Sequence, residues 1–339
     1  MRPRSIFSTT TLAIMLLSVL CWGPPVFETV FAAQAKPEVT TLKVGLSAPS
    51  LSFLPNWVAD QKGFFKKEGF TEVKILVFRG NAPTVQALSG GTIDLCVAAL
   101  NGLIETIKSG QKFKGFWAGY NMPIFAWYGQ PKFKSIAETK GGRYGVTKYG
   151  SLTDFLTRYA LRNAGLDPEK DVKILQLGGT REFVAAMESG QLDASILDIP
   201  LIYLVAEKGF VRLMSQKEHV SRDYPTHAVY AKEEFIAQNP NKIKAYLRAT
   251  TKAMEWIKAN PDEAAKVASD QMKFKAEHCR KGIDEMIDEW YPDGRLPQTG
   301  MKIFWEIAVS AGDVTEPWPN NKWLDDTFLK TQDQWRKPR

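Results

Sequence analysis

A motif that occurs twice constrains the fold of this chain more than any other feature of its sequence. The first copy, NAPTVQALSGGTIDLCVAA, covers residues 81–99, and the second, TREFVAAMESGQLDASILDI, covers residues 180–199. Six positions correspond, about a hundred residues apart: Val85, Ala87, Leu88, Gly91, Ile93 and Asp94 match Val184, Ala186, Met187, Gly190, Leu192 and Asp193. Two copies at this separation predict two similar α/β lobes and therefore a cleft between them.

Each copy has the pattern of a short helix, a glycine stop and a buried strand. In the first copy, Asn81 is the predicted N-cap, and Pro83 falls in the first turn, where its missing N–H costs nothing. Gly90-Gly91 supplies the left-handed residue that ends the helix. Residues 93–99 are almost continuously apolar, as in a strand that is covered on both faces. The two aspartates stand where the strands begin, away from the cleft, and we interpret both as structural.

Strands and helices alternate through the first two thirds of the chain. Further strands are predicted at 41–46, 70–79, 114–118, 124–128, 141–148 and 172–177, and further helices at 56–65, 101–108 and 151–163. A break at 120–123 is where we expect the chain to change lobes, and 224–230 is the predicted return strand. The remainder is predicted to be helical at 241–258, 262–272, 275–290 and 301–311, with a tail, 315–339, that packs across a lobe surface.

The first 35 residues have the features of a cleavable secretory signal peptide. Arg2 and Arg4 form a positive n-region, residues 11–22 are apolar but too short to span a bilayer, and 33–35 offer an A-x-A cleavage site. Cys21 suggests a lipoprotein, but lipoprotein signals resemble one another in carrying a small residue where this chain has Leu20, so we expect no lipid anchor. The mature protein is expected to be soluble in the periplasm.

The charge of the chain argues against a nucleic-acid partner. The formal net charge is +7, and removal of the first 35 residues lowers it by one, to +6. Lysine and arginine are scattered among acidic residues, without the stripe that nucleic-acid binding requires. A mild positive balance is compatible with an anionic ligand. Cys96 falls in a predicted buried strand and Cys279 on a late helix, so we expect two free thiols.

Ligands of open α/β sheets bind beyond the carboxyl ends of the strands. This rule selects the loops at 47–53, 80–81, 99–101, 147–151, 178–181 and 198–199. Several of them lead into helices, whose free N–H groups suit carboxylate, sulfonate or phosphate oxygens. Four residues there have two interpretations, as helix caps alone or as caps that also face a ligand: Asn81, Asn101, Ser151 and Thr180.

Two charged residues near these loops are also open to two interpretations. Arg181 could clamp an acidic group of a ligand through two parallel hydrogen bonds, or it could be solvated at the start of a helix. Asp198 could accept a hydrogen bond from a ligand amine or hydroxyl, or cap the backbone that follows.

Patterns that support catalysis or metal binding are missing from the sequence. The three histidines, His219, His227 and His278, show no H-x-x-x-H or Cys/His ligand spacing. Neither a G-x-S-x-G nucleophile elbow nor a P-loop is present. We therefore predict no catalytic residue, no metal site and no cofactor, and the chain is interpreted as a binding protein.

The chain resembles the extracytoplasmic solute-binding proteins of ABC transporters in the nitrate, sulfonate, taurine and pyrimidine-precursor group. The resemblance covers nearly all of the mature chain, and it rests on TLKVGLSAPS, WVADQKGFFKKEG, VQALSGGTIDL, YGVTKYGSLTDFLTRYALRNAGL and FVAAMESGQLDASILDIP. It implies a type II periplasmic-binding fold of two α/β lobes, two hinge strands and a helical C-terminal segment. Lobe 1 would be 36–121 plus 225–339, and lobe 2 would be 122–224.

The resemblance also implies a function and a pocket. The function would be capture of a small organic anion, such as a sulfonate, carboxylate, aromatic acid or pyrimidine precursor, by a monomer that serves an ABC permease and its ATPase subunit. Alternatives are a ligand sensor or a TRAP-type component of the same fold and, more remotely, a pyrimidine-synthase-like enzyme, whose cysteine-rich motif is missing here. Arg181 is added to this pocket because it lies in the loop at 178–181, directly after Thr180. The predicted pocket then consists of Ser52, Phe53, Asn81, Ala99, Asn101, Tyr149, Ser151, Thr180, Arg181 and Asp198.

Overall fold

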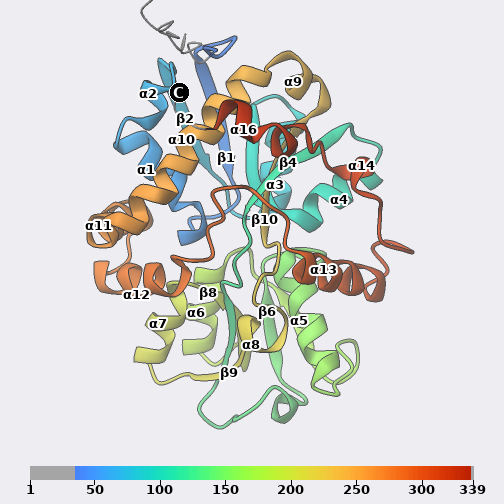
Figure 1. Ribbon diagram of the computed structural model, residues 1–339. Helices are drawn as coiled ribbons and strands as arrows, with labels where there is room; N and C mark the ends of the chain where they lie inside the picture. The colour runs from blue at the N-terminus through green and yellow to red at the C-terminus, as the bar shows by residue number, and fades with distance from the viewer. Residues whose placement is uncertain (1–34, 337–339) are drawn as a thin grey trace, which may run out of the picture. The chain divides into compact units, whose positions relative to one another are not determined.

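Two five-stranded sheets with the same internal arrangement form the frame of the protein (Figure 1). The computed structural model describes residues 35–336, so the predicted signal peptide, apart from Ala35, and Cys21 lie outside the described residues. The strand orders are β2-β1-β3-β10-β4 in the first sheet and β7-β6-β8-β5-β9 in the second. In both sheets three parallel strands are followed by a fourth strand that runs antiparallel to its neighbours on both sides.

The strands of the first sheet are β1 (Thr41–Leu46), β2 (Glu72–Val77), β3 (Leu95–Ala99), β4 (Phe113–Tyr120) and β10 (His227–Lys232). Those of the second are β5 (Phe125–Gly129), β6 (Arg143–Val146), β7 (Lys173–Gln176), β8 (Ala194–Asp198) and β9 (Val211–Ser215). The helices between them are η1 (Leu51–Phe53), α1 (Leu54–Gln61), α2 (Phe64–Lys67), α3 (Asn81–Ser89), α4 (Leu100–Lys108), η2 (Ala137–Thr139), α5 (Leu152–Asn163), α6 (Thr180–Glu188), α7 (Leu201–Glu207) and α8 (Gln216–His219).

The repeated motif forms the same substructure in both sheets. Its copies are α3 with β3 and α6 with β8, and each helix is followed by a left-handed glycine, Gly91 at φ 76° and Gly190 at φ 72°. Asp94 Oδ2 accepts a hydrogen bond of 2.9 Å from the backbone N–H of Lys43 at the start of β1. Asp193 Oδ2 accepts the equivalent bond, 3.1 Å, from Arg143 at the start of β6. The structural interpretation of both aspartates is confirmed.

The chain changes sheets at residues 121–124, because β4, which ends at Tyr120, lies in the first sheet and β5 lies in the second. The chain returns between α8 and β10. The two crossing segments contact each other, since the Thr226 hydroxyl donates to the Met122 carbonyl over 2.5 Å. Both crossings lie where the polar loops of the two sheets meet.

The C-terminal part is helical, as expected. Its helices are α9 (Glu233–Gln238), α10 (Pro240–Ala259), α11 (Pro261–Met272), α12 (Ala276–Met286), α13 (Gln298–Ser310), α14 (Asn320–Trp323), α15 (Thr327–Lys330) and α16 (Gln332–Trp335). In the tail, Trp323 and Trp335 are buried, and the Asp325 N–H donates to the Gly115 carbonyl of β4.

One predicted helix differs in the structure, whereas the state of the cysteines agrees with the prediction. The single helix predicted at 56–65 is wrong, because Gly63, at φ 69°, separates α1 from α2. Cys96 and Cys279 are free and buried, as predicted. None of the helices within 35–336 combines the length and the apolar composition that crossing a membrane requires.

Candidate functional site

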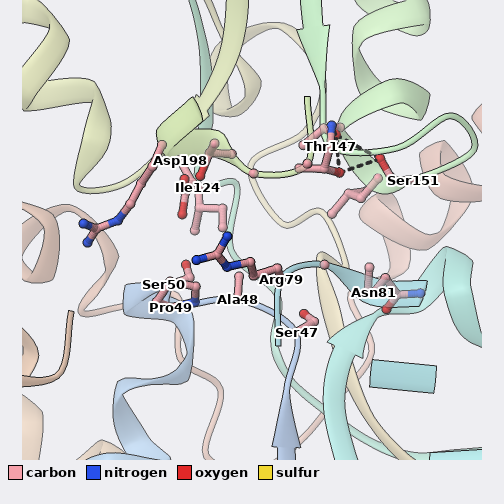
Figure 2. Close-up of a pocket in the computed structure, with 18 of the residues that line it drawn as sticks. Ser47, Ala48, Pro49, Ser50, Arg79, Asn81, Ile124, Thr147, Ser151 and Asp198 are labelled. Carbon is pink, nitrogen blue, oxygen red and sulfur yellow. Dashed lines mark hydrogen bonds between the residues drawn. The ribbon is translucent and has the colours of Figure 1, made fainter. Parts of the chain in front are cut away.

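A cavity of about 400 Å³ lies between the loops at the carboxyl ends of strands from both sheets. Figure 2 shows Ser47, Ser50, Arg79 and Asn81 on one side of it and Ile124, Thr147, Ser151 and Asp198 on the other. The wall is partly apolar, through Ala48, Pro49, Ala99, Ile124, Phe125, Leu152 and Met272. The structure therefore brings the polar loops selected by the strand-end rule to a single place.

The cavity wall contains six of the ten residues predicted for the pocket: Asn81, Ala99, Ser151, Thr180, Arg181 and Asp198. The other four lie outside it. Ser52 and Phe53 are fully buried behind Ser50. The carbonyl of Ser52 accepts from the Trp290 indole over 3.3 Å, and the ring of Phe53 packs edge-on against His227, with centroids 4.7 Å apart.

Asn101 and Tyr149 lie near the cavity but are engaged elsewhere. Asn101 Nδ2 donates to the Gly150 carbonyl over 3.3 Å, which links α4 of the first sheet to the loop before α5. The Tyr149 side chain is 53% exposed, and its hydroxyl donates to the Ile174 carbonyl over 3.0 Å. Tyr149 therefore faces a smaller adjoining cavity of about 170 Å³, which Asn81 and Ser151 also line.

Four helices begin at the cavity, and none of these four has a side-chain cap. The N-cap positions of α3, α4, α5 and α6 are Gly80, Ala99, Ser151 and Gly179. The interpretation of Asn81, Asn101 and Thr180 as N-caps is thus wrong, because these residues already belong to the helices. Helix N-termini without caps retain backbone N–H donors and a partial positive charge, so all four ends suit a negatively charged group.

Ser151 occupies its predicted N-cap position, but its hydroxyl is used in another way. It joins a cluster of three hydroxyls, with 2.8 Å between Thr147 Oγ1 and Ser151 Oγ and 2.9 Å from Thr153 Oγ1 to each of the other two (Figure 2). The Thr147 N–H also donates to Thr153 Oγ1 over 2.9 Å. This cluster holds the loop between β6 and α5 in place, and all three residues line the cavity.

Five charged residues line the cavity, three positive and two negative: Arg79, Arg181, Lys273, Glu182 and Asp198. The side chain of Arg79 is 88% exposed, and its guanidinium lies 3.7 Å from Glu182. Figure 2 shows it reaching between Ser50 and the side of Asp198. Arg181 is engaged, because it donates to the Met272 carbonyl and lies 4.3 Å from the centre of the Phe274 ring. Arg79 is thus the more available of the two guanidinium groups.

Burial shifts the pKa of two titratable groups in the wall toward the neutral form, and Asp198 remains mostly charged at neutral pH. Burial raises the pKa of Asp198 to about 6, although the hydroxyls of Thr180 and Ser50 and the charge of Arg181 act in the opposite direction. Burial lowers the pKa of His227 to about 3. Within the described chain, neither Asp198 Oδ1 nor His227 Nδ1 has a hydrogen-bond partner. An unpaired buried polar atom is costly, so both atoms are available to a ligand.

Several wall residues were not predicted. Ile124 and Phe125 have the pattern of an ordinary strand, and Met272 and Lys273 come from the end of α11, far beyond the second copy of the motif. Nothing local in the sequence connects that helix end with the loops of the sheets. Glu182 could have been identified, because it follows Thr180 and Arg181 in the first turn of α6.

The wall does not resemble a metal centre. Residues 35–336 contain no group of three or more His, Cys, Asp and Glu side chains placed to hold an ion. Asp198 and Glu182 are the only carboxylates among the wall residues.

Comparisons with known proteins agree on the class of protein. The sequence model of the family described as "NMT1/THI5 like" matches residues 50–264, more than half of the chain. The nitrate/nitrite binding protein NrtA of Nostoc sp. strain PCC 7120 is 28% identical over 310 residues, which cover 79% of this chain and 66% of that protein. The chain therefore spans slightly less than two thirds of the Nostoc protein.

Two solved structures show the same architecture. A protein from Bordetella bronchiseptica RB50 is 26% identical, with a TM-score of 0.75, over 88% of this chain and 99% of that one. The periplasmic aliphatic sulphonate binding protein SsuA of Escherichia coli is 16% identical, with a TM-score of 0.68, over 85% of this chain and 92% of that one. The predicted two-lobed α/β periplasmic-binding fold is confirmed.

The relatives named above are binding proteins, in agreement with the interpretation of the chain as a binding protein. The resemblance found in the sequence motifs is confirmed as well. Because the family model matches more than half of the chain, the chain belongs to the NMT1/THI5-like family.

Proposed function

We propose that this protein captures a small organic anion in the cavity between its lobes and delivers it to an ABC importer. The observation that carries the proposal is the convergence of four uncapped helix N-termini, two from each sheet, on one cavity. Each end offers backbone N–H donors and a partial positive charge to an anionic group. The charged wall residues add a net positive charge of one.

The size and the lining of the cavity favour an organic body over a bare inorganic ion. A volume of about 400 Å³ is typical of pockets for small organic molecules. Ile124, Phe125 and Leu152 give part of the wall an apolar surface. A sulfonate or carboxylate with an aliphatic or aromatic body would place its charge at the helix ends and its body against these side chains.

The mode of action follows from the two lobes. We propose lobe 1 as 36–121 plus 225–339 and lobe 2 as 122–224, which close about the crossings at Met122 and Thr226. Ligand would stabilise the closed form, and the closed monomer would be recognised by a permease and its ATPase subunit. The signal peptide at 1–35 would direct the chain to the periplasm.

A second candidate is a sensor, or the binding component of a TRAP transporter, with the same site. The cavity supports this candidate equally, because ABC-importer binding proteins, sensors and TRAP-transporter binding components would all capture a ligand and close around it. Co-purification with a permease would distinguish them: an ATPase-coupled permease supports the first proposal, and a permease without an ATPase subunit supports the TRAP alternative.

The proposal is tested by thermal-shift screening of the mature chain against sulfonates, carboxylates, aromatic acids, nitrate and pyrimidines. One class of anion should raise the melting temperature and should reduce the radius of gyration in solution scattering. The variant Ser151→Ala/Asn101→Ala should weaken binding of that anion more than it lowers the melting temperature, because both side chains hold the loop between β6 and α5 that forms part of the cavity wall. Stabilisation by neutral or cationic compounds alone would refute the anionic part of the proposal.

A further inference from the structure

Asp198 is the feature of the cavity that an anion-binding site does not explain. Only 6% of its surface is exposed, and Oδ1 makes no hydrogen bond within residues 35–336. A negatively charged ligand would be repelled by it. A carboxylate accepts hydrogen bonds and does not donate them, so its natural complement is an N–H or O–H group.

The protein itself does not supply a full partner for this carboxylate. The cationic side chain that acts on it is Arg181, which is held by the Met272 carbonyl and by the face of Phe274. The hydroxyls of Thr180 and Ser50 favour its charged form, but burial outweighs them. A ligand that brings a hydrogen-bond donor into the cavity would therefore stabilise the buried Asp198 carboxylate.

Other groups that line the same cavity have the opposite character. Arg79 lies on the loop before α3, is paired only at 3.7 Å with Glu182, and extends toward the cavity (Figure 2). The uncapped starts of α3 and α5 lie at Gly80 and Ser151. Groups that attract an anion and a group that attracts a donor thus line the same cavity.

We propose that Asp198 determines ligand specificity by accepting a hydrogen bond from an ammonium or other N–H group of the ligand. The ligand is then bipolar, with a carboxylate or sulfonate directed to Arg79 and the helix ends and a nitrogen directed to Asp198. This inference rests on the proposed function and narrows its ligand class. His227 Nδ1, also unpartnered in the described chain, lies in the same wall and offers a second polar contact to the nitrogen end.

The test uses pairs of anions that differ only in an amino group. Suitable pairs are 3-aminopropanoate with propanoate, 2-aminoethanesulfonate with ethanesulfonate, and 4-(aminomethyl)benzoate with 4-methylbenzoate. Dissociation constants are measured calorimetrically at pH 7.5 for the wild-type mature chain, for Asp198→Asn and for Asp288→Asn. Asp288 is a matched control, because its side chain is 91% exposed and lies outside the cavity wall.

At least one amino member should bind the wild type tenfold or more tightly than its partner. Asp198→Asn should remove this preference, with a loss of tenfold or more for the amino member and less than threefold for the other, and Asp288→Asn should leave it intact. Equal or tighter binding of the members without an amino group overturns the inference and leaves the proposed function standing. Binding by no member of any pair overturns the inference, and it overturns the proposed function as well when other anions also fail to bind.

A neutral Asp198 that donates to an anion would give a different result. The members without an amino group would then bind more tightly at pH 5 than at pH 7.5, and Asp198→Asn would retain that binding at both pH values. This outcome would also overturn the inference.

Discussion

The side chain of Asn81 lies directly against the Cα of Gly102: a Cβ atom built at Gly102 would lie 1.5 Å from Asn81 Nδ2. This contact joins the start of α3 to the first turn of α4. Asn81 Oδ1 also accepts from the Tyr230 hydroxyl over 3.3 Å. The orientation of a residue in the cavity wall therefore depends on a glycine that does not line the cavity.

Gly102→Ala should displace Asn81 and destabilise the protein by about 1–3 kcal/mol, although glycine to alanine within a helix is ordinarily stabilising. Binding of the identified anion should weaken as well. Asn81→Ala/Gly102→Ala should recover most of the lost stability, because the clashing atoms are gone. The measurement is chemical denaturation of the two single variants and the double variant, and additive losses in the double variant would contradict the prediction.

Glu182→Gln should strengthen anion binding by roughly threefold or more, because it removes a resident negative charge from the start of α6 and frees Arg79. The gain should shrink as the salt concentration rises, since exposed charges are screened. Glu188→Gln is the matched control on the same helix, where Glu188 pairs with Lys208 outside the cavity wall. The measurement is calorimetric titration of wild type, Glu182→Gln and Glu188→Gln with the identified anion. An unchanged or weaker affinity of Glu182→Gln would argue against an anion bound at the start of α6.

Asp198→Asn should stabilise the ligand-free protein at neutral pH. Its folded pKa of about 6 lies above the ordinary value of 3.8, so the folded state loses stability as the pH rises between these two values. The substitution should raise the free energy of unfolding by at most about 3 kcal/mol at pH 7.5, and this increase should vanish near pH 4. Denaturation at both pH values tests this, and an equal gain at pH 4 would show that the cause is packing and not charge.

His227→Gln should make the protein less sensitive to acid. The folded pKa of about 3 lies below the ordinary 6.5, so the stabilisation is complete above pH 6.5 and is lost as the pH falls toward 3. In the wild type, protonation linked to this histidine should lower the free energy of unfolding by about 2 kcal/mol at pH 5 relative to pH 7.5. His219→Gln is the control, because His219 is half exposed. Stability curves from pH 4 to 8 that remain parallel for wild type and His227→Gln would contradict the prediction.

Arg181→Gln should favour a more open form of the ligand-free protein. Arg181 connects the start of α6 to the end of α11 through the Met272 carbonyl and the Phe274 ring. Solution scattering should show a larger radius of gyration for this variant than for wild type or Arg162→Gln, which alters an exposed position on α5. A radius equal to that of wild type would mean that other contacts hold the lobes together.

Much of the fold could be predicted because the determining signals are local. The glycine at the end of each helix, the apolar runs of β3 and β8 and the aspartate at the start of each strand all lie within one copy of the motif. Because the motif occurs twice, it also predicted two similar sheets, and the matching strand orders of the two sheets agree with that prediction.

The capping interpretation failed because three of the four helices begin one or two residues before the predicted position. Gly80 and Gly179 take the N-cap positions of α3 and α6, and Ala99 that of α4. Asparagine, serine and threonine near a helix start are statistical indicators of a cap, whereas the start itself is set by where the preceding strand ends. The same shift leaves the helix N–H groups uncapped by side chains.

The two-copy α/β plan, the family and the loops that carry the polar wall residues can be inferred from the sequence, since they depend on periodicity, glycine positions and short motifs. Three relationships depend on how the chain packs: the ring of Phe53 lies against His227, Arg181 is held by the end of α11, and Asp198 is buried with no hydrogen bond to Oδ1 among the described residues. These relationships join segments that are far apart in the chain, and burial and hydrogen bonding over such separations arise only when the sheets and helices pack together.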